Sequence, residues 1–194
     1  MPDASTTTAG DPRARGRRTL LLIALVAFLP VVASTLIYLF FPRPAGTNYG
    51  TLLPTRPAPD VAGIALDGTP FRLSALQGRW LLVTAARGAC DERCRAALYA
   101  TRQARTIQGR EQDRLVRVWL VTDGGTPPPE VLREHPGLVV ARIAPSALAS
   151  WPGGADVIYL VDPLGNLVLQ YPQDPDIKGL AKDLKRLLSA SSIG

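Results

Sequence analysis

Hydrophobic positions gather first in one unbroken stretch near the start of the chain, from Leu20 to Phe41, which contains no charged residue. In a helix that rises 1.5 Å per residue, this stretch is long enough to cross a bilayer core of roughly 30 Å. The tail over 1–19 is rich in arginine, and the positive-inside rule keeps such a tail in the cytoplasm. The pattern predicts a single-pass anchor over 20–41 in the inner (plasma) membrane, with the rest of the chain on its periplasmic or extracytoplasmic side. The arginines behind this prediction are Arg13, Arg15, Arg17 and Arg18.

A cleavable signal peptide is the alternative interpretation, because Val31-Val32-Ala33 follows Pro30 and resembles a site of cleavage. The chain stays apolar from Leu36 to Phe41, beyond that site. We therefore expect an uncleaved helix, since a membrane helix tolerates a proline.

Residues 42–59 are rich in proline and glycine, which predicts a semi-extended tether without regular structure. One part of it, Asn48-Tyr49-Gly50, is too specific for a simple spacer. We expect these three residues to form a turn that packs against the domain that follows, over 60–194.

From Asp60 onward, short apolar runs alternate with segments of helical period. The run from Trp80 to Thr84 has almost no polar position, as in a strand that is buried on both faces. The order of elements is typical of an α/β fold, a thioredoxin-like three-layer domain with a mixed β-sheet. We expect a hairpin over 61–66 and 70–73, strands at 80–84, 115–122 and 138–143, helices at 91–108 and 129–134, a second hairpin over 157–161 and 167–171, and a closing helix at 174–188.

Composition narrows the classes of function. With 46% hydrophobic residues, the exported part can bury a core of its own without a disulfide framework. The net charge of +6 comes from 22 basic and 16 acidic residues that are scattered along the chain, so we expect no nucleic-acid partner. A single histidine leaves no Ser/His/Asp set to argue for.

The only two cysteines, Cys90 and Cys94, stand where the strand at 80–84 gives way to a helix. Residues i and i+4 share one face of a helix, and their Cα atoms are about 6 Å apart, within the reach of a disulfide. A helix N-terminus favours the thiolate, which is both the redox nucleophile and the metal ligand. We expect the two sulfurs to lie side by side and to be reachable from solvent.

Three interpretations of this pair stay open. It is an inert local disulfide, a dithiol that exchanges with a partner's disulfide, or a pair of ligands for a soft metal such as Cu(I). The CxxxC spacing differs from the CxxC of common oxidoreductases, which argues against a general thioredoxin.

Three segments carry a family resemblance: GIALDGTPFRLSALQGRWLLV, then GACDERC, then IYLVDPLGNLV. Together they resemble the Sco/SenC family of membrane-anchored copper proteins with a thioredoxin fold, over about Asp60 to Leu188. Members of that family help to assemble the copper centre of cytochrome c oxidase. The resemblance implies that Cys90 and Cys94 match the two family cysteines, and that the partner is a cytochrome c oxidase subunit or another copper or redox assembly protein.

The chain departs from the family pattern at two places. Arg95 stands where the family has a proline, and Gly154 and its neighbours stand where the family has the histidine that is its third copper ligand. The only histidine, His135, precedes a different strand, and we expect it to be a helix-end residue. Copper as Cu(I), held by Cys90 and Cys94 alone with the third ligand missing, is thus the cofactor to consider.

These observations predict a thioredoxin-like protein of the periplasmic face that acts in cytochrome c oxidase assembly through thiol–disulfide exchange or Cu(I) binding. Cys90 is expected to attack and Cys94 to resolve the mixed disulfide. Two alternatives come from other classes: a non-catalytic scaffold that keeps the fold without the copper site, and a general exported thiol–disulfide reductase.

Overall fold

The computed structural model describes residues 12–40, 48–155 and 157–193, and the chain divides into two compact units, Met1–Ala45 and Gly46–Gly194. The first unit contains the helix α1 (Pro12–Phe40), which continues through Pro30. Helix is therefore confirmed over 20–40, whereas residues 1–11 of the predicted tail and 41–47 around the start of the predicted tether lie outside the described residues. Among the described residues, no helix has the combined length and apolarity that a membrane span requires.

The second unit is built on one mixed sheet of eight strands in the order β1-β8-β7-β4-β5-β6-β2-β3. Its three central strands β4, β5 and β6 are parallel, and β7 runs antiparallel to β4. From Asp60 onward the strands begin and end within two residues of the predicted positions. The strands are β1 (Thr51–Pro57), β2 (Ala62–Ala65), β3 (Pro70–Arg72), β4 (Trp80–Ala86), β5 (Leu115–Val121), β6 (Leu138–Ile143), β7 (Val157–Val161) and β8 (Asn166–Pro172).

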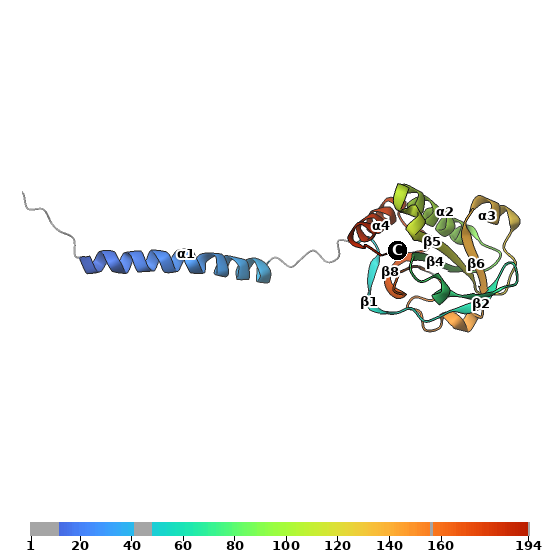
Figure 1. Ribbon diagram of the computed structural model, residues 1–194, viewed down its shortest axis with the longest axis horizontal. Coiled ribbons are helices and arrows are strands. Elements are labelled where there is room, and N and C mark those ends of the chain that lie inside the picture. Colours follow the sequence, from blue (N-terminus) through green and yellow to red (C-terminus); the bar gives the residue numbers. More distant parts are fainter. Residues whose placement is uncertain (1–11, 41–47, 156, 194) are drawn as a thin grey trace, which may run out of the picture. The chain divides into compact units, whose positions relative to one another are not determined.

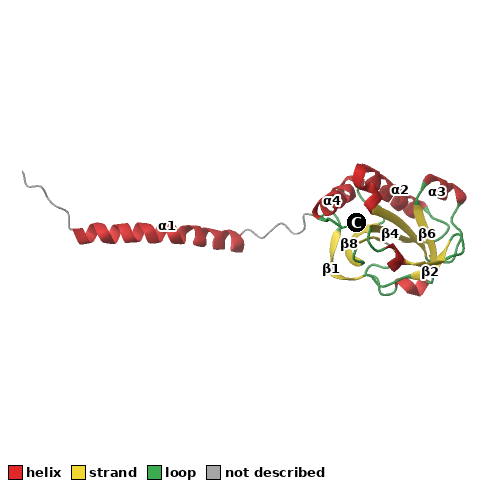
Figure 2. Ribbon diagram, in the orientation of Figure 1, coloured by secondary structure: helices red, strands yellow, loops and turns green. Residues whose placement is uncertain are grey.

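Three helices cover one face of this sheet, as Figure 1 shows. They are α2 (Glu92–Ile107), α3 (Pro129–Glu134) and α4 (Ile177–Ala190). The opposite face packs against two short 3₁₀ helices, η1 (Leu73–Leu76) and η3 (Pro145–Leu148), which are red like the other helices in Figure 2. A third 3₁₀ helix, η2 (Gly109–Arg114), links α2 to β5.

The central strands explain the position of the core. Every residue of β4 and of β5 is buried, because side chains alternate between the two faces and both faces are covered. Leu81, Val83 and Ala85 pack on the side of η1 and η3, whereas Trp80 and Leu82 pack under α4. The continuous apolar run in the sequence therefore marks a strand between two layers, as expected.

The prediction of a tether without regular structure is wrong for part of its length. Residues Thr51–Pro57 form β1, which pairs with β8 at the edge of the sheet through an irregular register between Leu52 and Arg56. Prolines are tolerated there, because an edge strand leaves one row of its backbone groups unpaired. The pairing makes this segment part of the second unit.

The three residues before β1 fasten that strand to α4. The Tyr49 hydroxyl accepts the Asp176 N–H at 2.8 Å, the Gly50 N–H donates to Asp183 at 2.8 Å, and Arg186 donates to Asn48 at 3.1 Å. The predicted packing of Asn48-Tyr49-Gly50 against the domain is confirmed. We call these three residues the latch.

Candidate functional site

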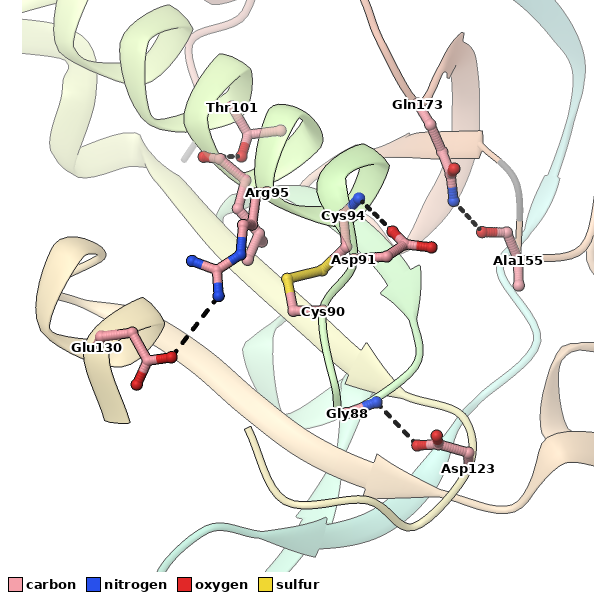
Figure 3. The surroundings of a disulfide bond; sticks show 11 residues. Gly88, Cys90, Asp91, Cys94, Arg95, Thr101, Asp123, Glu130, Ala155 and Gln173 are labelled. Carbon is pink, nitrogen blue, oxygen red and sulfur yellow. Dashed lines mark hydrogen bonds and ion pairs between the residues drawn. A yellow bond between two sulfur atoms is a disulfide. The ribbon is translucent and has the colours of Figure 1, made fainter. Parts of the chain in front are cut away.

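Cys90 and Cys94 form a disulfide with their Cα atoms 5.1 Å apart, at the junction of β4 and α2 (Figure 3). The helix expected over 91–108 begins one residue later than predicted, and Cys90 lies outside it, so the i, i+4 geometry of a helix does not describe this pair. Asp91 is the N-cap of α2, with its carboxylate accepting the Cys94 N–H at 3.0 Å, so the helix begins only at Glu92. Cys90 lies before the cap with a φ of 48°, a left-handed conformation that is uncommon for a residue with a side chain.

The disulfide is buried, with each cysteine only 2% exposed. The prediction that the sulfurs are side by side is confirmed, but the prediction that they are reachable from solvent is wrong for this oxidised form. The turn before Cys90 folds inward and seats both sulfurs in an apolar cluster between α2, α3 and the sheet. The rest of that cluster is Ala86, Leu98, Trp119, Val121, Val131 and Val140.

Asp123, in the loop after β5, holds the turn that carries Cys90. Its Oδ1 accepts the Gly88 N–H at 2.8 Å and the Gly125 N–H at 3.0 Å, and its Oδ2 lies 3.4 Å from Arg87 Nε. The hydrogen bond from Gly88, followed by that from Gly125, lowers the pKa of the Asp123 carboxyl. This carboxylate is therefore ionised wherever an ordinary aspartate is, and it joins the loops that follow two neighbouring parallel strands.

The two loops touch backbone to backbone beside the disulfide. A Cβ atom added to Gly88 would lie 2.5 Å from the carbonyl carbon of Gly125, so no side chain fits there. Asp123, Gly88 and Gly125 were not predicted from the sequence as part of the site. The signal was present, because parallel neighbouring strands bring their following loops to one edge of the sheet.

Both positively and negatively charged groups lie near the disulfide. Helix α2 points its positive N-terminal end toward the sulfurs, which favours a thiolate there, while the Asp91 carboxylate at the cap opposes it. Arg95, on the first turn of α2, lies 3.6 Å from Glu130 of α3, an ion pair between half-exposed side chains that partly neutralises this arginine. Arg87 projects into solvent with its side chain 82% exposed.

The residues present do not make a three-ligand copper site. In the described part of the chain, no three side chains of His, Cys, Asp or Glu come together as a group that holds a metal. Near the start of β7, where the resembling family has its histidine, a Gln173 amide instead donates to the Ala155 carbonyl at 2.9 Å (Figure 3). Because the two sulfurs are bonded to each other, they could bind a metal ion as thiolates only after the disulfide is reduced.

His135 is the C-cap of α3, as predicted, and not a ligand beside the cysteines. It is 4% exposed and its Nδ1 lies 3.4 Å from Nη1 of Arg117, a buried arginine that also donates to the Pro136 carbonyl at 2.8 Å. Burial, with Arg102 and Arg117 nearby, lowers the pKa of His135 to about 4. Arg117 was not predicted as a buried residue, although a lone arginine inside the apolar run of β5 was the sign of a buried polar contact.

Comparisons with known proteins identify the family and the fold of this chain. A family model described as "Transmembrane-like, thioredoxin-like, C-terminal domain" matches residues 80–191, and one described as "Transmembrane-like, N-terminal domain" matches residues 10–40. A comparison with curated proteins found no match.

Solved structures show the same fold at low identity. Copper-bound ScoI from Arabidopsis thaliana is 19% identical over 68% of this chain and 98% of that chain, with a TM-score of 0.58. Apo Sco1 from Thermus thermophilus is 23% identical over 76% and 99%, with a TM-score of 0.57. The thioredoxin domain of a thiol-disulfide oxidoreductase from Bacteroides vulgatus is 21% identical over 70% and 99%, with a TM-score of 0.54. The second unit therefore has a thioredoxin-like fold.

Proposed function

The chain belongs to the transmembrane-like, thioredoxin-like family, and from that premise we propose that it exchanges thiols and disulfides with a partner protein through Cys90 and Cys94. The observation that carries the proposal is a disulfide across a short turn where the first parallel strand meets its helix. We further propose that residues 20–41 anchor the chain in the membrane and that the thioredoxin-like unit faces the periplasm. Its client in this proposal is a subunit of cytochrome c oxidase or another copper or redox assembly protein. The likeness to copper-bound ScoI supports the link to copper, and the resemblance to the Sco/SenC family supplies the oxidase as the client.

The exchange needs only the two sulfurs and a partner disulfide. In the reduced protein, the Cys90 thiolate attacks one partner sulfur, the partner disulfide breaks, and its second sulfur leaves as a thiolate that takes up a proton. The Cys94 thiolate then attacks the Cys90 sulfur and displaces the first partner sulfur, which is protonated in turn. Two electrons pass to the partner, the two protons of the dithiol follow, and the chain ends with the Cys90–Cys94 disulfide that the structure contains.

A purely stabilising disulfide is the less economical interpretation. The loop that this disulfide closes has a sequence separation of only 4 residues, and a short loop constrains the unfolded chain less than a long one. The surrounding core is apolar and continuous without it, since strands, α2 and α3 contribute large side chains to the same cluster. The position at the end of β4 suits chemistry better than stability.

A non-catalytic scaffold is the second candidate, and two observations favour it. The disulfide is buried to 2% exposure, and the described part of the chain provides no third copper ligand beside it. In this hypothesis the domain binds an assembly partner through its surface, and the cysteines only close the turn.

Trapping of a mixed disulfide separates exchange from scaffolding. In full-length protein, Cys94→Ser leaves Cys90 without its resolving partner, so incubation with glutathione disulfide is expected to leave one glutathione attached to most chains by mass spectrometry. Cys90→Ser is the matched control, and it is expected to trap several-fold less because Cys94 lies inside the first turn of α2. No adduct with either variant would favour the scaffold.

The same reduced protein tests the copper alternative and the general reductase. Two thiolates are a donor pair for Cu(I), so uptake of one copper per chain that is lost in Cys90→Ser would move the assignment toward copper binding. Reduction of CxxCH peptide disulfides as fast as other disulfides would instead favour a general exported reductase.

A further inference from the structure

A buried disulfide must be uncovered before another thiol can reach it. A thiolate attacks along the line of the S–S bond, and both cysteines of this bond are 2% exposed. The rest of the cluster comes from the central strands, α2 and α3, which cannot move apart without breaking the core. Cys90 itself is carried by the turn that joins β4 to α2, residues 87–90, which belongs to no helix or strand.

Three contacts hold this turn, and all three involve the Asp123 carboxylate. Gly88 and Arg87 bind the Asp123 carboxylate directly, at 2.8 and 3.4 Å. The carboxylate also binds Gly125 at 3.0 Å, which brings that backbone against Gly88. Within the turn, the Cys90 N–H donates to the Arg87 carbonyl at 3.1 Å, so movement of Arg87 and Gly88 would carry Cys90 along.

The close contact of the two glycines makes the closed position a tight fit. A Cβ atom on Gly125 would lie 2.9 Å from Asp123 Oδ1 and 3.2 Å from the Gly88 Cα atom. Its φ is not in the left-handed region, so an alanine there meets a problem of space and not of backbone conformation. Such an alanine would push the two loops apart while leaving every charge in place.

We propose that Asp123 is a positioning residue that gates the Cys90–Cys94 disulfide: it clamps the 87–90 turn over the sulfurs, and a partner thiolate reacts only after the clamp opens. This proposal rests on the proposed function and assigns its regulation to the loop after β5. The open state loses the hydrogen bonds to Asp123 but keeps the sheet and α2 intact. The substrate class is a protein thiol or disulfide that displaces this turn as it docks.

Reduction kinetics of full-length protein test the gate, with dithiothreitol as the thiol and alkylation of free cysteines as the readout. In wild type, opening limits the reaction, so the rate is expected to reach a plateau as the dithiothreitol concentration rises. Asp123→Ala is expected to raise the plateau by about tenfold or more, because hydrogen bonds to an ionised acceptor hold the turn closed. Gly125→Ala is expected to raise it in the same direction without a change of charge.

The control is Asp67→Ala. Asp67 binds the backbone of its own turn in a similar way, accepting the Thr69 N–H at 2.9 Å, but it lies between β2 and β3, away from the cysteines. Its removal is expected to leave the plateau within twofold of wild type. Unfolding midpoints of all variants are measured alongside. They show whether a raised plateau comes from opening of the turn or from a general loss of stability.

The outcomes separate the gate from the function. If the Cys94→Ser variant traps glutathione but the plateaus are equal in wild type, Asp123→Ala and Gly125→Ala, the gate alone is overturned. A disulfide that resists dithiothreitol in wild type but reacts in Asp123→Ala would support the gate and count against exchange under native conditions. Resistance in every variant would overturn both.

Discussion

His135, the C-cap of α3, lies buried beside the buried Arg117 of β5. Arg117 keeps its charge, because its pKa falls only to about 10 through burial and the nearby Arg105 and Arg102. A second positive charge on His135 would be both desolvated and repelled, and its pKa is therefore about 4 instead of 6.5. The imidazole is neutral in the folded protein above about pH 4, and its Nδ1 accepts a hydrogen bond from Nη1 of Arg117 at 3.4 Å.

This lowered pKa predicts a loss of stability in mild acid. The unfolded chain protonates His135 below pH 6.5 while the folded protein does so only below about 4, so stability is full above pH 6.5 and falls between these values. Each pKa unit corresponds to about 1.4 kcal/mol, which gives a loss of roughly 3 kcal/mol by pH 4 from this residue. Denaturant unfolding of wild type and His135→Gln, followed by tryptophan fluorescence from pH 4 to 7, measures the difference.

Glutamine keeps an acceptor for Arg117 but does not titrate, so carboxylates elsewhere contribute equally to both proteins. The variant is expected to lose less stability than wild type as the pH falls. Parallel curves for the two proteins would mean that His135 does not titrate as its burial implies.

Among the elements, α4 and the latch depend on each other. The ring of Tyr49 stacks on Tyr171 with centroids 6.0 Å apart, and its hydroxyl binds the N-terminal end of α4 through Asp176. Gly179 makes room for it, because a Cβ atom there would lie 2.6 Å from Cγ of Tyr49. The latch thus fixes the start of the second unit against its last helix.

Removal of the Tyr49 side chain is expected to destabilise the second unit by about 1–2 kcal/mol, through loss of the stacked pair and of one hydrogen bond. Tyr49→Phe keeps the ring and should lose only the smaller part that belongs to the hydroxyl. The free energy of unfolding in denaturant, read by tryptophan fluorescence, gives both values.

Tyr99→Ala is the matched control, since Tyr99 is similarly exposed on α2 and contacts only Arg102 among the aromatic and cationic contacts of the described residues. It should cost less than half of what Tyr49→Ala costs. Equal losses in the two alanine variants would show that the latch adds nothing specific.

For the whole molecule, the sequence predicts the elements better than it predicts how they meet. The strands from Asp60 onward follow from apolar runs, because both faces of β4 and β5 are covered. Strand β1 is not recognisable from its local pattern, since its prolines resemble a tether and its pairing with β8 depends on residues more than a hundred positions away. The latch could be recognised as unusual, but its partner α4 could not be identified from it.

The candidate site divides in the same way. Proximity of Cys90 and Cys94 follows from their local spacing, whereas their burial depends on loops that come from separate strands. Asp123 and Gly125 approach Gly88 only because β4 and β5 are adjacent and parallel. Local pattern therefore predicts that a disulfide can form, and only the assembled sheet determines what can reach it.

The reduction potential of the Cys90–Cys94 disulfide in the full-length protein tests the central claim most directly. Equilibration with glutathione buffers, followed by alkylation and mass spectrometry, is expected to give a value in the range of exchanging pairs, about −120 to −270 mV. A value below roughly −300 mV is typical of structural disulfides, and it would contradict the assignment of this pair to thiol–disulfide exchange.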